Sequence, residues 1–462
     1  MALKIVILCG GAGLRLWPIS TNNLPKQYAP ILENKTLLDL TLERVKDMYD
    51  GKEIILVCNA KHTFHVKASL EKFKITAKLI LEPEGKNTAP AIYLAARVAL
   101  KNDDLLIMPS DHMIRDNYMF QENIKKIASL TSFREWITLG VKPRNPSSAY
   151  GYIKTQKEKS NLLKAIKFIE KPTKKKATEF LRDNSYYWNS GIFLGKSSMI
   201  IKSITQFAPR IAYECENALK TKKISIDNNE ISFLPEIFSK IPSKSIDYAV
   251  LEHDKNIKLF PLTCLWDDLG SWDSIEKLGN QGSKDEKVVE IQSENNFIKT
   301  QNRVIATIGV KDLIIIDSDN ATLIAKKTYS ENVKKIVEIL KKSNNKNLVE
   351  STYDERPWGN FKILLDSNNC KVKKLSISPF KRISLQFHNF RSEHWLIVEG
   401  KASIYLNGAL IEANPGDSVD IPQGTHHYVE NKNNKELIII ETQLGSYFGE
   451  DDIIRIEDPY NR

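Results

Sequence analysis

A glycine-rich turn near the start of this 462-residue chain has the composition of a phosphate-binding loop. Gly10, Gly11 and Gly13 directly follow an apolar, strand-like run, and glycines there let backbone N–H groups approach a phosphate closely. The turn lacks the ending of a Walker A loop and the third glycine of the dinucleotide fingerprint, so a plain tight turn would explain the glycines alone equally well. Arg15 and Lys26 add two cations within one loop of the glycines, which favours the binding of a triphosphate.

Two aspartates are candidates for holding the Mg²⁺ ion that accompanies a triphosphate. Asp111 follows the apolar run at 105–108 in the segment Pro-Ser-Asp-His, and ligands of parallel α/β sheets bind at the carboxyl ends of the strands. A helix N-cap would explain Asp111 alone equally well. Asp268 lies far along the chain in the segment 266–272. Because one carboxylate rarely suffices for a catalytic Mg²⁺, we expect the fold to bring the two aspartates together.

Histidines gather in the last quarter of the chain. Only eight histidines are present, and four of them fall between His388 and His427 in a β-rich segment. Clustering of this kind indicates a metal site, whereas surface or packing histidines would explain the clustering without one. The choice between the two depends on the spacing of neighbouring ligands, which is considered below.

Strand-like runs alternate with helical patterns through the first half of the chain. This alternation predicts a mostly parallel α/β sheet with helices on both faces. We expect Thr88 to cap the second of two well-defined helices. The expected strands are 4–9, 53–58, 78–81, 105–108 and 137–141, and the expected helices are 37–49 and 89–100.

The pattern changes near Gly282. Short β-like pieces fill 288–327, a charged helical segment covers 330–342, and the polar stretch 343–346 is typical of a linker. From residue 353 onward the pattern is almost all β, which predicts a separate small barrel or jelly roll. The expected domains are therefore 1–282, 283–346 and 347–462.

Composition excludes several classes of protein. Hydrophobic residues make up 42% of the chain and charged residues 27%, which is typical of a globular protein. The net charge of +10 is spread over short lysine runs without interleaved aromatic residues, so we expect solvated helix faces and no nucleic-acid partner. No apolar stretch is long enough for a membrane span. The five scattered cysteines favour a reducing cytoplasmic location without a disulfide framework.

The motifs of about the first 280 residues resemble, in order, those of sugar-1-phosphate nucleotidylyltransferases, specifically the mannose-1-phosphate guanylyltransferases. Two departures are Leu14, where the family usually has Thr or Lys, and Lys86, where Arg is common. The matching segments are 10–18, 24–27, 82–91, 109–112, 150–153, 168–172, 188–191, 247–249 and 266–272.

This resemblance implies a Rossmann-like nucleotidyltransferase domain that binds GTP and mannose 1-phosphate. An oxygen of the sugar phosphate would attack the α-phosphorus and expel pyrophosphate, so no protein nucleophile is needed. The implied roles are GTP phosphate binding for Gly10, Gly11, Gly13, Arg15 and Lys26; Mg²⁺ binding for Asp111 and Asp268; nucleoside contact for Gly85, Asn87 and Thr88; and sugar-phosphate contact for Gly151, Glu170, Lys171 and Asn189.

The C-terminal spacing resembles the two cupin motifs. These motifs are Gln386-x-His388-x4-Glu393-x6-Gly400 and Gly416-x5-Pro422-x-Gly424-x2-His427-x3-Asn431, with glutamine replacing the usual first histidine. The resemblance implies a cupin β-barrel in which one divalent ion is held. The implied ligands are Gln386, His388, Glu393 and His427, a set that suits Zn²⁺ and also Mn²⁺, Co²⁺ or iron.

Further segments resemble the cupin-type mannose-6-phosphate isomerase half of bifunctional enzymes, so the resemblance covers nearly the whole chain. These segments are 356–359, 381–386, 391–395 and 449–455. An isomerase of this class moves a proton between C1 and C2 of mannose 6-phosphate and fructose 6-phosphate, and Arg391 and His394 are the expected candidates for the proton transfer. Departures from the family are Asn389, Phe390 and Tyr428.

The whole reading predicts a bifunctional enzyme of the route to GDP-mannose that uses Mg²⁺ for guanylyl transfer and a second divalent metal for isomerisation. Three alternatives differ in class. One is a guanylyltransferase for another sugar 1-phosphate with an inactive or repurposed cupin, another is a regulatory protein that binds GTP or sugar without turnover, and the least favoured is a NAD-dependent dehydrogenase. We expect small-molecule partners and no membrane partner, and the sequence leaves a homo-oligomer open.

Overall fold

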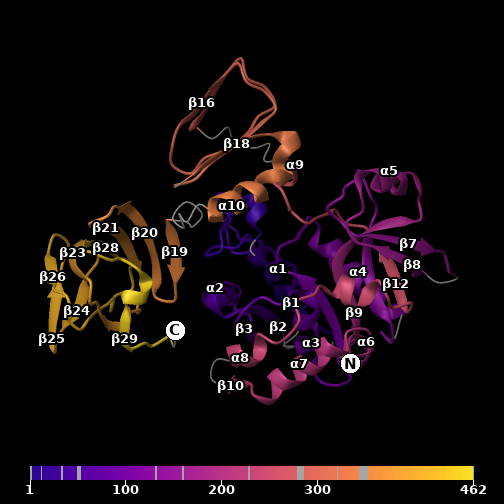
Figure 1. Cartoon of the computed structure of the whole chain (residues 1–462), viewed down its shortest axis with the longest axis horizontal. Coiled ribbons are helices and arrows are strands. Elements are labelled where there is room, and N and C mark those ends of the chain that lie inside the picture. Colours follow the sequence, from indigo (N-terminus) through magenta and orange to yellow (C-terminus); the bar gives the residue numbers. More distant parts are fainter. Residues whose placement is uncertain are drawn as a thin grey trace. The chain divides into compact units, whose positions relative to one another are not determined.

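The computed structural model of the chain divides into two compact units (Figure 1). The first contains Met1–Lys299, Val304–Ile315 and Leu323–Val337, and the second contains Thr300–Arg303, Ile316–Thr322 and Glu338–Arg462. The predicted change of character at Gly282 and the predicted linker at 343–346 lie outside the described residues. The structure describes residues 3–11, 13–32, 35–48, 54–130, 133–158, 161–226, 229–277, 286–319, 321–342 and 352–460.

The first unit is built on an 11-stranded sheet that contains all five predicted strands. Strands β11, β3, β2, β1 and β4 pair in parallel, as do β6 and β12. The other pairings are antiparallel. The sheet is therefore mixed, and the prediction of a mostly parallel sheet is wrong. In sheet order, the strands are β10 (Lys223–Ser225), β11 (Glu230–Ser232), β3 (Ala77–Glu82), β2 (Ile54–Asn59), β1 (Leu3–Cys9), β4 (Asp104–Pro109), β9 (Tyr186–Lys196), β6 (Trp136–Val141), β12 (Ile257–Pro261), β8 (Leu163–Ile169) and β7 (Tyr152–Gln156).

The difference follows from the connections. Strands β7 and β8 are consecutive in the chain and pair side by side through a short link. A parallel pair would need a crossover of a dozen or more residues, which this link is too short to provide. The hairpin therefore places antiparallel strands at one edge of the sheet.

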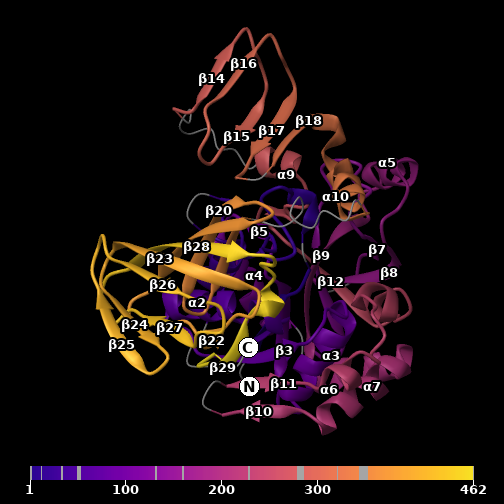
Figure 2. The ribbon, with the colours of Figure 1, turned by 60° about the vertical axis from the view of Figure 1, so that its left-hand side comes forward.

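The central strands of the sheet are buried on both faces, because helices cover it. In β1, Ile5, Val6 and Ile7 are all buried, although successive side chains point to opposite faces. Helices α3, α6 and α7 pack against one another and contribute to the same apolar cluster as Val6 (Figures 1 and 2). The helices are α1 (Leu37–Lys46), α2 (Thr63–Phe73), α3 (Thr88–Val98), α4 (Asn117–Leu130), α5 (Lys174–Arg182), α6 (Ser197–Phe207), α7 (Pro209–Lys220), α8 (Pro235–Phe238) and α9 (Trp272–Lys277).

Both predicted helices are confirmed, as α1 and α3, but the predicted cap of α3 is wrong. The N-cap is Asn87, whose side-chain oxygen accepts a hydrogen bond from the N–H of Thr88. Asn87 has a φ of 69°, in the left-handed region. Thr88 lies inside the helix, and its hydroxyl oxygen accepts a hydrogen bond of 2.8 Å from the N–H of Ile246. The threonine therefore ties α3 to a distant segment.

The β-rich segment and the charged helix that follows it are present as predicted. Strands β14 (Val288–Ile291) and β16 (Ile305–Ile308) pair in parallel, and three further strands form a small sheet. These three are β15 (Phe297–Lys299), β17 (Leu313–Asp317) and β18 (Thr322–Lys326), and the segment continues into the 3-10 helix η4 (Lys327–Asn332) and α10 (Val333–Lys342).

The predicted C-terminal barrel of cupin type is confirmed, and it is built from two antiparallel sheets. Its interior has an apolar end and a polar end. Along β28, the inward-facing residues are Leu437 and Ile439, then Glu441 and Gln443. One sheet contains β19 (Tyr353–Arg356), β20 (Gly359–Asp366), β21 (Cys370–Ile377), β28 (Leu437–Gly445), β23 (Arg391–Glu399) and β26 (Ser418–Ile421); the other contains β25 (Ala409–Ala413), β24 (Ala402–Leu406), β27 (His427–Glu430), β22 (Leu385–Phe387) and β29 (Ile454–Glu457).

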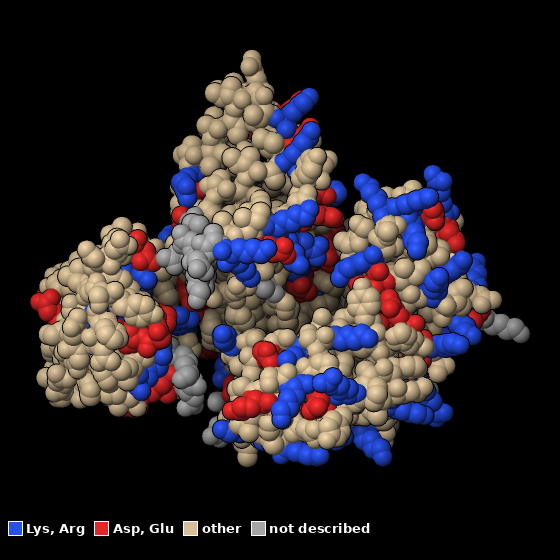
Figure 3. All heavy atoms as spheres, in the orientation of Figure 1, with Lys and Arg blue, Asp and Glu red and all other residues tan. Residues whose placement is uncertain are grey.

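Three general expectations concern the whole chain. All five cysteines are free thiols. Within the described ranges, none of the helices combines the length and the apolar character that a membrane span requires. On the face seen in Figure 3, Lys and Arg side chains are spread over many elements and interspersed with Asp and Glu. This distribution fits the solvated charged faces expected from the lysine runs.

Glu82, at the end of β3, should make the stability of the first unit depend on pH. Burial raises the pKa of Glu82 to about 8, above the ordinary value of a glutamate. The folded state therefore favours the protonated form, and its stability falls as pH rises from the ordinary pKa to the raised one. Glu82→Gln should unfold at a higher urea concentration than the wild type at pH 8.5, with a gain of ~3 kcal/mol.

The same gain should nearly vanish at pH 4.5, where the wild-type carboxyl is largely protonated in the folded state. Glu71→Gln, a substitution of an exposed glutamate on α2, serves as the matched control. An equal difference between wild type and Glu82→Gln at both pH values would contradict the assignment.

Candidate functional site

The side chains of Gln27 and Lys26 contact the glycine-rich turn. The Gln27 amide donates hydrogen bonds of 3.1 Å to the carbonyl oxygens of Cys9 and Gly11. Gly13 has a φ of 60°, and a Cβ atom there would lie 2.6 Å from Cγ of Lys26. Only glycine therefore allows the Lys26 side chain to run directly against the turn.

Lys26 joins the two predicted magnesium ligands. Its ammonium lies 3.0 Å from Oδ2 of Asp111 and donates a 2.6 Å hydrogen bond to the carbonyl oxygen of Asp268. The Tyr150 hydroxyl donates to Oδ1 of Asp268 at 3.0 Å. Arg15 lies in the 3-10 helix η1 (Leu14–Leu16), and its charge acts on the Tyr150 hydroxyl. Lys26, Asp111 and Asp268 thus lie around one position.

The electrostatics of this cluster keep Asp111 ionised. Burial alone would raise the pKa of the Asp111 carboxyl, but the charges of Lys26 and His112 outweigh it and leave the pKa below its usual range. Burial lowers the pKa of His112, whose Nδ1 accepts a hydrogen bond of 3.3 Å from the indole N–H of Trp266. Ionised carboxylate and carbonyl oxygens are the donors that Mg²⁺ prefers, so this group fits the predicted ion.

The four residues predicted to contact the sugar phosphate also lie together. A Cβ on Gly151 would meet Oε2 of Glu170 at 2.3 Å and Cβ of Asn189 at 3.4 Å, so the glycine makes room for both side chains. Lys171 has a largely exposed side chain, and its ammonium lies 3.5 Å from Oε1 of Glu170. Burial, with a contribution from the charge of Asp247, raises the pKa of Glu170 to about 7.

Asp247 is a member of this group that the sequence analysis did not single out. Its Oδ1 accepts a 2.9 Å hydrogen bond from the Asn189 amide. The residue stands in the matched segment 247–249, which was the available signal, but a single carboxylate there suggested no role. It begins the π-helical turn η3 (Asp247–Leu251) next to Ile246, which Thr88 holds. This turn therefore links the expected nucleoside and sugar segments.

The residues predicted to lie near the nucleoside differ in how they are engaged. Asn87 and Thr88 both bond to backbone N–H groups, as described for α3. Gly85 has open space around the position of a missing Cβ. The first two residues thus shape the turn, and Gly85 leaves room beside it.

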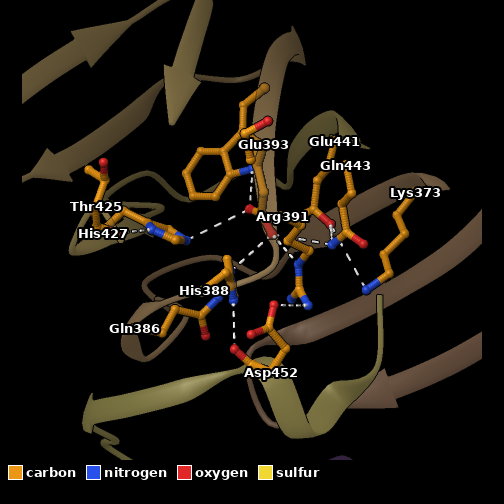
Figure 4. A network of polar contacts seen from close by, with 12 residues as sticks. Lys373, Gln386, His388, Arg391, Glu393, Thr425, His427, Glu441, Gln443 and Asp452 are labelled. Carbon is orange, nitrogen blue, oxygen red and sulfur yellow. Dashed lines mark hydrogen bonds and ion pairs between the residues drawn. The ribbon is translucent and has the colours of Figure 1, made fainter. Parts of the chain in front are cut away.

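The second unit contains a buried group of potential metal ligands at the polar end of the barrel. The donor atoms of His388, Glu393 and His427 lie within 4.8 Å of one another (Figure 4). Nε2 of His388 lies 3.0 Å from Oε1 of Glu393, and Nε2 of His427 lies 3.7 Å from Oε2. Among the described residues, neither Nε2 atom has a hydrogen-bond partner of acceptable geometry, although both are buried.

The outer nitrogens of the two histidines are fixed by backbone carbonyl groups. Nδ1 of His388 lies 3.2 Å from the carbonyl oxygen of Asp452, and Nδ1 of His427 lies 2.8 Å from that of Thr425. Such contacts orient metal-binding histidines and leave Nε2 for the ion. Burial lowers the pKa of His427, which favours the neutral, ligating form. The three residues therefore fit a divalent metal ion.

Gln386, the predicted fourth ligand, lies beside this group. It is buried and is the register partner of His427 between β22 and β27. Its Oε1 accepts a 2.9 Å hydrogen bond from the hydroxyl of Ser384. Its role as a ligand stays a prediction.

Three side chains hold the Glu393 carboxylate. Arg391 and Gln443 each donate to Oε1 at 3.2 Å, and the indole N–H of Trp395 donates to Oε2 at 3.0 Å. Burial alone would raise the pKa of Glu393, but the close contact with His388 and the charges of His427 and Arg391 bring it well below its usual range. The sequence analysis missed Gln443 and Trp395, because neither belongs to a ligand motif.

The structure does not bring His394 to this centre. His394 follows Glu393 on β23, so its side chain points to the opposite face, where it is 45% exposed and lies 2.6 Å from Asp420. This position, away from the buried group, disagrees with the prediction that His394 takes part in proton transfer. Arg391 does face the centre, but its guanidinium is buried against Glu393 and Asp452 and supports other residues.

Comparison with known proteins identifies the family of each part of the chain. Residues 4–285 match the nucleotidyl transferase family, residues 286–340 match the mannose-phosphate isomerase/GMP-like β-helix domain, and residues 342–458 match the mannose-6-phosphate isomerase C-terminal family. The chain belongs to the mannose-1-phosphate guanylyltransferases that carry this isomerase domain. The mannose-1-phosphate guanylyltransferase RfbM of Salmonella typhimurium is 33% identical over 99% of this chain and 97% of its own length.

Two solved structures are similar to parts of the chain. A Thermus thermophilus protein described as a mannose-1-phosphate geranyltransferase has a TM-score of 0.65 and 26% identity, and it covers 74% of this chain and 100% of its own. A mannose-6-phosphate isomerase from Helicobacter pylori has a TM-score of 0.51 and 29% identity, and it covers 58% of this chain and 100% of its own.

Metal affinity should distinguish a histidine that faces the barrel interior from one on the outer face of the barrel. His427→Ala removes a buried donor atom, so the affinity of the second unit for Zn²⁺ should fall at least about a hundredfold. Competition with a chromophoric chelator measures this affinity in the full chain. His394→Ala, which removes a histidine from the opposite face, is the matched control and should bind Zn²⁺ like the wild type. Equal losses in the two variants would show that the ligand group is wrong.

Proposed function

We propose that the chain transfers GMP from GTP to mannose 1-phosphate, giving GDP-mannose and pyrophosphate, and that its cupin domain interconverts fructose 6-phosphate and mannose 6-phosphate. The main support for the first activity is the position of Lys26, whose side chain lies beside the glycine-rich turn and whose ammonium contacts both Asp111 and Asp268. The names of relatives such as the Salmonella enzyme support the choice of sugar and nucleotide. We further propose the domain division 1–282, 283–346 and 347–462.

In guanylyl transfer, the protein supplies position and charge. Arg15 and Lys26 neutralise phosphate oxygens, and the glycine-rich turn offers its N–H groups to them. Asp111 and Asp268 would hold Mg²⁺, which supplies charge neutralisation at the phosphates when bound. A phosphate oxygen of mannose 1-phosphate forms a bond to the α-phosphorus, while the bond from that phosphorus to the bridging oxygen breaks and releases pyrophosphate.

Selection of the sugar falls to the group around Gly151. Glu170 and Asn189 offer a carboxyl and an amide to sugar hydroxyls, and Asp247 fixes the amide through its bond to Asn189. A sugar with the wrong hydroxyl pattern would leave these partly buried polar groups unpaired, which is the costly form of mismatch. Lys171, with its exposed ammonium, is available to the sugar's phosphate.

Asp111→Asn should lower the rate of guanylyl transfer strongly. The amide keeps the size of the side chain but removes the charge that holds Mg²⁺ and pairs with Lys26, so we expect kcat/KM to fall about a thousandfold, or ~4 kcal/mol. Pyrophosphate release from GTP and mannose 1-phosphate measures it. Asp47→Asn, on an exposed aspartate after α1, is the control and should keep full activity. A loss of less than tenfold in Asp111→Asn would remove Asp111 from the proposed machinery.

The isomerase activity rests on the buried group His388, Glu393 and His427, with Gln386 beside it. These residues would hold Zn²⁺ or another divalent ion such as Co²⁺ or Mn²⁺, which supplies positive charge while a proton moves between C1 and C2. The family match of residues 342–458 supports this assignment. Arg391, Gln443 and Trp395 keep the Glu393 carboxylate oriented.

Two departures from the family lie away from this group. Tyr428 follows the inward-facing His427, and its ring stacks on Tyr405 at 5.1 Å and lies under Arg382. Phe390 is 53% exposed and packs edge-on against Tyr447. Neither substitution touches the proposed ligands, so both departures are compatible with isomerase activity.

Removal of the metal should separate the two activities. Treatment with a chelator, followed by fresh Mg²⁺ alone, should leave guanylyl transfer intact and abolish isomerisation of mannose 6-phosphate, and Zn²⁺, Co²⁺ or Mn²⁺ should restore the latter. His427→Ala should show the same pattern without a chelator. Isomerisation that survives in His427→Ala would rule out a metal-dependent reaction at this site.

The alternative with a different sugar predicts another product. A panel of sugar 1-phosphates against the four nucleoside triphosphates, scored by product mass, would identify it. A best substrate other than mannose 1-phosphate with GTP would replace the first half of the proposal.

A further inference from the structure

A cluster of cations lies at the polar end of the barrel, beside the metal-ligand group. Lys373 on β21 is only 8% exposed, and Arg356 on β19 is 24% exposed. Both cations lie over the ring of Phe361, with Nζ of Lys373 at 4.8 Å and Cζ of Arg356 at 5.2 Å from its centre. Two strands and an aromatic ring therefore hold these positive charges in fixed positions.

One carboxylate occupies the space between these cations. Oε1 of Glu450 lies 3.6 Å from Nζ of Lys373, and Oε2 lies 3.6 Å from the Arg356 guanidinium. Burial alone would raise the pKa of Glu450, but the charges of Lys373, Arg356, Arg391 and Arg455 lower it. The carboxylate thus marks a position with strong positive potential.

Glu450 differs from its two partners in exposure and in support. Its side chain is 50% exposed and begins the three-residue 3-10 turn η6 (Glu450–Asp452). The buried Lys373 needs an anion, because an unpaired charge in such a position is costly. A half-exposed carboxylate on a short turn can instead move into water at little cost. Glu450 is therefore the exchangeable member of the cluster.

The cluster adjoins the metal-ligand group through shared residues. Asp452, in the same turn as Glu450, offers its carbonyl oxygen to His388 and its carboxylate to Arg391, which in turn contacts Glu393 (Figure 4). On the other side, Gln443 bonds to both Glu393 and Glu441, and Glu441 faces Lys373. A small molecule that reaches the metal ligands thus has these cations as close neighbours.

We propose that Lys373 and Arg356 form the subsite for the phosphate group of an open-chain sugar phosphate, and that Glu450 occupies this subsite until the phosphate displaces it. A phosphate monoester carries nearly two negative charges and three acceptor oxygens, so it outcompetes a single carboxylate for two fixed cations. This inference rests on the proposed isomerase function, because it assigns the distal end of the same substrate.

The test is calorimetric titration of the full, metal-loaded chain with mannitol 6-phosphate, which can be neither isomerised nor guanylylated. Lys373→Met keeps the length of the side chain and removes its charge, so it should weaken binding about tenfold or more. Lys374→Met, from the opposite face of β21, is the matched control and should bind like the wild type. Metal content, measured in parallel, should be unchanged in all variants.

Glu450→Gln provides a second, independent arm, because it keeps both cations and removes only the carboxylate that lies between them. Removing the competing carboxylate should tighten the binding of mannitol 6-phosphate about threefold and of inorganic phosphate similarly, whereas mannitol should bind to neither protein. Wild-type affinity in Lys373→Met, or weaker binding in Glu450→Gln, would overturn the subsite. Binding that depends on Lys373 in a protein without isomerase activity would uphold the subsite and contradict the proposed reaction.

Discussion

The ammonium of Lys26 lies in a nearly closed position, where the Asp111 carboxylate and the carbonyl oxygen of Asp268 contact it. A buried charge without such partners would be neutralised or expelled. The arrangement requires that Asp111 at the end of β4, Asp268 after β13 (Trp266–Asp267) and the turn at Gly13 converge on one point. The sheet order places these segments, and the missing Cβ of Gly13 lets the lysine approach. The proposed phosphate-binding position of the first unit therefore depends on one paired charge.

The need to pair a buried charge also governs the barrel of the second unit, where the charge is negative. There the buried charge is the Glu393 carboxylate, which is held by His388, Arg391, Gln443 and Trp395. Arg391 must itself be paired, and Asp452 does this while its backbone carbonyl group orients His388. Each partner thus requires the next, and the chain of pairs extends from the metal ligands to the surface turn that carries Glu450.

Much of this arrangement could be predicted from the sequence, because local patterns report local structure. The five expected strands, both helices and a small C-terminal barrel follow from the sequence pattern, and the cupin type of this barrel was implied by the resemblance of its motifs to those of cupins. The antiparallel half of the sheet could not be predicted in this way, because the pairing of β9 with β4 and β6 is a contact between distant segments. The predicted cap of α3 was wrong by one residue. Asn87 has a positive φ, so it lies outside the helix as its N-cap, and the helix begins at Thr88.

The candidate sites show a similar division. Asp111 and Asp268 were predicted from their residue type and position, and His388 and His427 were implied by the resemblance to the cupin motifs; in each pair the two residues lie close together. Asp247 and Gln443 were missed, since each acts on another side chain and not on a recognisable ligand pattern. His394 was assigned to the centre because of its neighbours in sequence. Its side chain lies on the other face of β23, which the alternation of a strand dictates once Glu393 is known to point inward.

The alternation of side chains along the strands also explains why the polar interior residues lie at one end of the barrel. Along β28, Leu437 and Ile439 close the interior with apolar side chains, whereas Glu441 and Gln443 continue the same face with polar ones. On β23, Ile397 and Trp395 match the apolar half, and Glu393 stands opposite Gln443 in the ladder. A polar group placed among the apolar residues would have no partner, and an apolar residue beside Glu393 would leave its carboxylate unpaired. The strand register therefore places the polar side chains, including Glu393, Arg391 and Gln443, at one end of the barrel.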